Sequence, residues 1–134
     1  MALKGTFQIT NWEESTDDKA DTLIDKTKLT NATVSQSYIE TESTDNDSLI
    51  GESTVHYTMH YFANGNASFV GLEYINGSLN KTPCKLVLKH DGKFENGQAS
   101  SKFIIIDSDN ADFNKYTGGS FVSGENGQAN YSFD

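Results

Sequence analysis

The chain has 134 residues, only 35% of them apolar, and a formal net charge of −9 at pH 7, which suits one acidic domain over residues 1–134. Such a charge repels nucleic-acid phosphates and anionic membrane surfaces, so neither partner is expected. Fifteen aromatic residues, spread along most of the chain, argue against disorder.

The start of the chain leads straight into a strand-like segment. Residues 1–4 precede it without an apolar signal region, and no stretch approaches membrane-spanning length. The one cysteine, Cys84, has no partner for an internal disulfide. These features predict a cytoplasmic protein.

Eight strand-like segments follow one another along the chain. Residues 14–27 are the nearest candidate for a helix and are expected to form a turn or two, and the acidic stretch 41–49 is expected to be an exposed loop. The strands are predicted at 4–13, 28–40, 50–62, 66–75, 78–95, 98–107, 113–123 and 127–134. Their mostly short connections predict an all-β fold, a closed eight-stranded antiparallel meander barrel.

The turn after the third strand predicts which side chains face inward. Ala63-Asn64-Gly65 suits a type I turn with Gly65 in the left-handed conformation, which places Val55 opposite Glu73. Opposed residues share a face of the sheet. The more continuously apolar face is predicted to be the inner one, with Val55, Tyr57, Met59, Tyr61, Phe69, Gly71 and Glu73.

Two further turns extend this pattern. Asn76-Gly77 is predicted to be a hairpin turn that places Glu73 opposite Asn80 near one barrel mouth, and Asn96-Gly97 places His90 opposite Phe103. A bulge is expected at Pro83, which lacks the amide hydrogen that a ladder needs. The inward residues of the fifth strand are then Asn80, Thr82, Cys84, Leu86, Leu88 and His90.

Glu73 is the carboxylate that this pattern points inward. It could recognise or deprotonate a small ligand, or it could lie at a wet mouth where Asn80 and a tyrosine satisfy it. His90 also points inward, but this register places it roughly 33 Å from the level of Glu73 along the strand. No Glu73–His90 contact is therefore expected.

Neither the histidines nor the aspartates form a convincing metal site. His56 and His60 share a strand face but stand about 13 Å apart, too far to bind one metal ion. The stretch 107–112, "DSDNAD", lacks the later glycine and glutamate of a calcium loop. No metal and no cofactor is expected.

The outer face of the predicted barrel is partly apolar. An apolar exterior predicts a subunit interface, in a dimer or trimer, unless the N-terminal loop covers it. The residues concerned are Val70, Leu72, Tyr74, Val87, Ile104 and Ile106.

Several segments resemble a small bacterial family of unknown function, DUF3224. They are "GTFQITNWEE" (5–14), "KLTNATVSQSY" (28–38), "ANGNASFVGLEYINGSL" (63–79) and "LVLKHDGKF" (86–94). The resemblance implies a single eight-stranded antiparallel barrel similar in fold to allene oxide cyclase, and it supplies no reaction. Allene oxide cyclases also use a glutamate inside their barrel, but no shared motif carries that role onto Glu73.

Two hypotheses for the function follow. The first is a barrel that binds a small apolar molecule at one mouth, or acts on it as an isomerase or cyclase. The alternative is a non-enzymatic homo-oligomeric module with a filled barrel. The candidate pocket residues for the first hypothesis are Glu73, Tyr57, Asn80, Val55, Met59 and Phe69.

Overall fold

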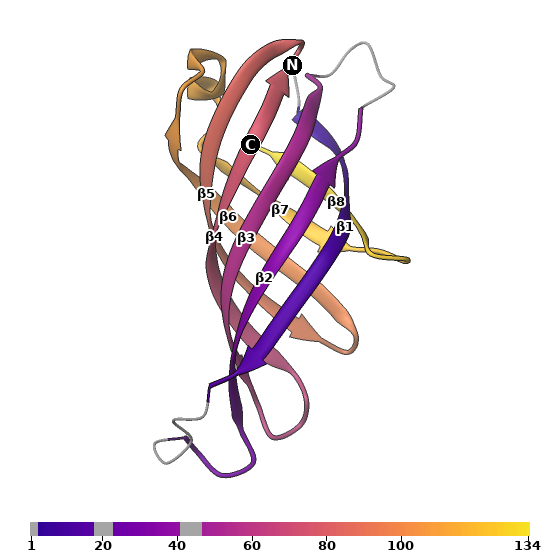
Figure 1. Cartoon of the computed structure of the whole chain (residues 1–134), viewed down its shortest axis with the longest axis vertical. Coiled ribbons are helices and arrows are strands. Elements are labelled where there is room, and N and C mark those ends of the chain that lie inside the picture. The colour runs from indigo at the N-terminus through magenta and orange to yellow at the C-terminus, as the bar shows by residue number, and fades with distance from the viewer. Residues whose placement is uncertain (1–2, 18–22, 41–46) are drawn as a thin grey trace.

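The computed structural model describes residues 3–17, 23–40 and 47–134, and it shows a closed barrel of eight antiparallel strands. Each strand pairs with the next along the chain, and β1 pairs with β8 to close the sheet, as Figure 1 shows. The predicted fold class is confirmed. The elements are β1 (Leu3–Thr16), β2 (Lys28–Tyr38), β3 (Leu49–Tyr61), β4 (Ala67–Leu79), β5 (Thr82–Glu95), β6 (Gln98–Ser108), the 3₁₀ segment η2 (Ala111–Lys115), β7 (Gly118–Ser123) and β8 (Gln128–Phe133).

Two expectations for the connections need correction. Residues 14–16 of the expected helical turn belong to β1, and residues 18–22 lie outside the described residues, as do 41–46 of the expected loop. The strand expected from residue 113 begins only at Gly118. The residues before it form η2, because the Asn110 side chain accepts a hydrogen bond from the Asp112 amide and starts a helical turn.

Two of the three predicted turns are confirmed. In the β3–β4 turn Gly65 has φ 90° and the Phe62 amide donates to the Asn66 carbonyl at 2.8 Å. In the β5–β6 turn Asn96 and Gly97 have φ 53° and 81°, as a two-residue type I′ turn requires. Val55 therefore pairs with Glu73, and His90 pairs with Phe103, as predicted.

The predicted turn at Asn76-Gly77 is wrong. Strand β4 continues through it, and the chain reverses at Asn80-Lys81, whose φ values of 50° and 70° fit a type I′ turn. Gly77 has a different role. It pairs with Gly51 of β3, and a Cβ atom on Gly77 would lie 2.0 Å from the Ile50 carbonyl oxygen. The glycine thus permits close approach of two strands.

This shift of the turn changes the level of every pair between β4 and β5. Glu73 pairs with Leu88 and not with Asn80. The bulge expected at Pro83 is also absent, because Pro83 pairs with Ser78 in unbroken register. The irregularity lies instead between Val87 and Leu88, where β5 pairs with β6.

The barrel interior holds one core that is closed at one end. Leu3, Leu49 and Leu79 are fully buried there, near the β4–β5 turn and η2. Phe113 of η2 packs beside Phe133, with ring centroids 6.0 Å apart, and so covers this end. At the other end lie the β5–β6 and β7–β8 turns (Figure 1).

Candidate functional site

A buried polar network fills the middle of the barrel around Glu73, which is 1% exposed. One carboxylate oxygen, Oε2, accepts three hydrogen bonds from side chains of β2 and β3. The donors are the Tyr38 hydroxyl at 2.6 Å, the Ser53 hydroxyl at 2.8 Å and Gln36 Nε2 at 3.0 Å. Three donors on one oxygen offset much of the cost of burying a carboxylate.

His90 binds the other carboxylate oxygen. Its Nε2 lies 2.7 Å from Glu73 Oε1, so the expectation that these residues do not meet is wrong. The reason is the register of β4 and β5. Glu73 pairs with Leu88, and His90 is two residues further along the same inner face, within reach of the carboxylate.

Both ring nitrogens of His90 have a polar partner. Ser101 Oγ is 2.9 Å from His90 Nδ1, and the Ser101 hydroxyl donates to the Lys102 carbonyl at 3.1 Å. Nε2 faces Glu73 Oε1 on the other side of the ring, so each ring nitrogen lies within hydrogen-bond distance of an oxygen. These contacts offset the cost of burying a polar ring in the barrel interior.

The tyrosines beside the pair stay neutral. Burial, and then the charge of Glu73, hold the pKa of Tyr38 well above its ordinary value, and the same two causes act on Tyr57. Tyr38 therefore keeps its hydrogen and donates it to Glu73. Tyr57 packs edge-on against His90, with ring centroids 5.9 Å apart.

An apolar cavity of about 110 Å³ opens toward the end that carries the β5–β6 and β7–β8 turns. Most of its wall is aromatic or aliphatic. Gln36 contributes a polar group to it, and Trp12, 43% exposed, also lines it. Its apolar wall includes Phe7, Met59, Phe69, Phe94, Phe121 and Ala129.

The six predicted pocket residues lie in three different places. Tyr57, Met59 and Phe69 line the cavity together. Val55 and Glu73 are buried in the barrel but are not part of its lining. Asn80 lies outside the barrel core, in the β4–β5 turn, where its side-chain amide nitrogen donates to Asp47 Oδ1 at 2.9 Å.

The sequence reasoning missed four members of the network. Gln36 and Tyr38 lie on β2, Ser53 on β3 and Ser101 on β6. A signal for Gln36 and Tyr38 was present, since they follow Val34 at alternate positions and so share its inward face. Ser53 likewise precedes the inward Val55 by two residues.

A second polar cluster holds the closed end together. Asp47, 1% exposed, accepts from Asn80, from the Tyr116 hydroxyl and from Lys115 Nζ at 2.8 Å. Burial raises the pKa of Asp47, but these donors and the Lys115 charge outweigh it and lower the pKa to about 2. The cluster links the start of β3 to the β4–β5 turn and to η2.

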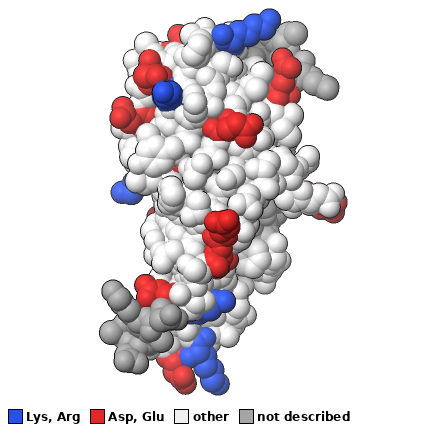
Figure 2. Space-filling model, viewed as in Figure 1, with Lys and Arg blue, Asp and Glu red and all other residues white. Residues whose placement is uncertain are grey.

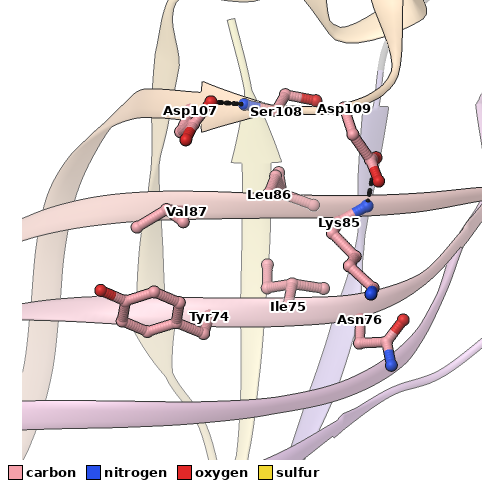
Figure 3. A pocket seen from close by; sticks show the side chains of 9 residues that line it. All are labelled: Tyr74, Ile75, Asn76, Lys85, Leu86, Val87, Asp107, Ser108 and Asp109. Carbon is pink, nitrogen blue, oxygen red and sulfur yellow. Dashed lines mark hydrogen bonds between the residues drawn. The ribbon is translucent and has the colours of Figure 1, made fainter.

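The outer surface carries apolar side chains on β4 and β6. Val70, Tyr74, Ile104 and Ile106 are 51, 51, 53 and 49% exposed. Figure 3 shows Tyr74 and Val87 side by side in a shallow groove on this surface, with Lys85 and Asp109 at its border. On the face shown in Figure 2, charged side chains are scattered and form no continuous basic patch.

The described part of the chain has neither a cluster of metal-ligating side chains nor a membrane-spanning helix. Within residues 3–17, 23–40 and 47–134, no group of three or more His, Cys, Asp or Glu side chains could hold a metal ion. In the same part of the chain, no helix is long and apolar enough to cross a membrane.

Comparisons with known proteins agree with the fold. A family model described as "Protein of unknown function (DUF3224)" matches residues 3–134. No curated protein matches the chain. A crystal structure of a protein with unknown function from the DUF3224 family of Shewanella oneidensis MR-1 is similar, with 21% identity and a TM-score of 0.65 over 99% of this chain and 95% of that one.

Proposed function

The chain belongs to the DUF3224 family of proteins of unknown function, and we propose that it binds a small, largely apolar molecule in the cavity at the open end of its barrel. The observation that carries the proposal is a cavity of about 110 Å³ with aromatic walls. Dry apolar cavities of roughly 150 Å³ bind a benzene-sized molecule. This smaller cavity therefore suits a single ring, part of which would extend into the cavity entrance. Eight-stranded barrels have room for one small ligand at most.

Binding is favoured over catalysis by the position of the acid–base groups. Glu73 and His90 do not line the cavity, and Gln36 lies between the carboxylate and the cavity. A general base must come within hydrogen-bond reach of the proton that it removes. The pair therefore supports the cavity wall, and the isomerase or cyclase alternative has less support.

The single tryptophan allows a direct test of binding. Because Trp12 lines the cavity, titration with toluene or cyclohexanol is expected to change its fluorescence saturably, with a Kd of about 0.1–1 mM for so few ligand atoms. Ala99→Leu, which adds bulk to the lining, should weaken binding. Its control is Ala63→Leu, the same change in the exposed β3–β4 turn.

Three further results decide this test. Shifts of the Met59 methyl signal in NMR spectra should saturate at the same ligand concentrations, because Met59 lines the cavity. Absence of saturable change at both Trp12 and Met59 would refute the proposal. Equal affinities in the Ala99→Leu and Ala63→Leu variants would place the ligand elsewhere.

A second candidate function, self-association, is favoured by the outer surface of β4–β6. Four exposed apolar side chains, Val70, Tyr74, Ile104 and Ile106, form its centre. Lys85, Lys89 and Lys102 are balanced there by Asp91, Asp107 and Asp109, so this face is neutral although the molecule carries −9. Two copies can thus meet there without strong repulsion, as in a self-complementary contact.

Light scattering tests this second candidate. The unmodified protein should show a dimer or trimer mass that falls toward the monomer mass on dilution, and Ile104→Glu should be monomeric because it buries a charge at the contact. Ile50→Glu, at another exposed isoleucine on β3, is the control. A monomer mass at every concentration excludes self-association.

A further inference from the structure

The cavity lining includes the buried amide of Gln36, whose orientation is fixed by the network behind it. We propose that the ligand donates a hydroxyl or N–H hydrogen to Gln36 Oε1, so that the site selects phenol-like rings over hydrocarbons. This inference rests on the proposed binding function and specifies the class of ligand.

The orientation of the Gln36 amide follows from its two partners. Its Nε2 lies 3.0 Å from Glu73 Oε2 and 3.3 Å from Ser53 Oγ. An ionised carboxylate can only accept hydrogen bonds, and Ser53 uses its one hydrogen on Glu73 at 2.8 Å. The Gln36 amide nitrogen therefore faces these two acceptors, and the carbonyl oxygen Oε1, on the other arm of the amide, points away from them.

That oxygen has no donor within the described part of the chain. Gln36 is 3% exposed, and all of its side-chain hydrogen bonds are made by Nε2. Its Oε1 atom is not fully enclosed by protein, unlike Asn110 Nδ2 and Tyr131 Oη, the two buried atoms without a partner in the described residues. Because Gln36 lines the cavity, Oε1 is accessible from there. An acceptor in a mostly apolar cavity favours a ligand that brings a donor.

The network also prevents the amide from adapting to other ligands. Rotating the amide by half a turn would place Oε1 against Glu73 Oε2 and bring two acceptors together. A ring that carries only an acceptor, such as anisole, therefore gains no hydrogen bond from Gln36 Oε1. A neutral phenol gains one hydrogen bond, which is worth about a tenfold difference in affinity.

Calorimetric titration of the full chain with phenol, anisole and toluene tests this proposal. Phenol is expected to bind about tenfold more tightly than either analogue. In Gln36→Met, which keeps the length of the side chain but removes the acceptor, the three affinities should become similar. In the unmodified protein, phenol alone should shift the NMR signals of the Gln36 side-chain amide, a measurement that does not depend on the folding of the variant.

The outcomes separate this inference from the function on which it rests. If toluene and phenol bind equally well to the unmodified protein, the donor requirement is wrong and the binding function stands. If Gln36→Met is folded and still prefers phenol, or if the Gln36 amide signals stay unchanged, another group recognises the hydroxyl and the inference is overturned. If none of the three rings binds, both proposals fail.

Discussion

Replacing Glu73 by alanine is expected to lower the free energy of unfolding by about 3–5 kcal/mol, a large part of the stability of a domain of this size. The variant leaves the donors of Tyr38, Ser53 and Gln36 without their acceptor in a buried site. It also removes the partner of the buried His90. Urea denaturation at neutral pH measures the loss.

Glu73→Gln is the matched variant for this prediction. Its amide oxygen can accept from the same three donors, and its NH₂ group can donate to a neutral His90 whose Nδ1–H still reaches Ser101. The expected loss is therefore only about 1 kcal/mol. Equal losses in the two variants would contradict the hydrogen-bond assignment, since alanine alone leaves every donor unsatisfied.

The prediction of inward and outward faces is correct for most of β3 to β5, although the β4–β5 turn was placed wrongly. Asn76-Gly77 and Asn80-Lys81 both suit two-residue turns, and they lie four residues apart. Moving the turn between them shifts the partner of Glu73 by eight residues, from Asn80 to Leu88. Eight is an even number, so Glu73, Leu88 and His90 keep the predicted inner face while their levels along the barrel change. Asn80 and Thr82, also predicted to face inward, are exposed at the β4–β5 turn.

The position of Glu73 along the barrel axis, which the register of β4 and β5 sets, decided whether the site could be predicted. The predicted register placed Glu73 beside the solvent-filled mouth of the barrel. The observed register places it beside His90, in the barrel interior. Asn-Gly is a strong turn signal, but a glycine also occurs where two strands approach closely, as Gly77 does beside Gly51. The sequence pattern alone does not distinguish these two reasons for a glycine.

The rest of the network depends on a register that no tight turn specifies. Gln36 and Ser53 are paired residues of β2 and β3, and residues 39–48 connect these strands. A connection of that length does not fix which residues face each other, so Gln36 could not be placed beside Glu73. Turn chemistry therefore predicted the β3–β4 and β5–β6 pairs, and only the structure joins them to β2.

The second large effect on stability is expected at the closed end of the barrel, where Asp47 binds Lys115 and Tyr116. Asp47→Asn is expected to lower the free energy of unfolding by about 2 kcal/mol at neutral pH, because the charge that binds Lys115 and Tyr116 is lost. Asp91→Asn, at an exposed position on β5, is the control and should change stability little. Urea denaturation of the three proteins gives the comparison.

The pH dependence of that difference is the sharper measurement. The pKa of Asp47 is about 2 in the folded protein and 3.8 in an unperturbed aspartate, so the unfolded chain binds the proton more readily. The stabilisation by Asp47 is therefore complete above about pH 4 and disappears as the pH falls toward 2. The stabilities of the unmodified protein and Asp47→Asn should converge over this range, whereas a constant difference would show that the Asp47 charge does not hold this end of the barrel closed.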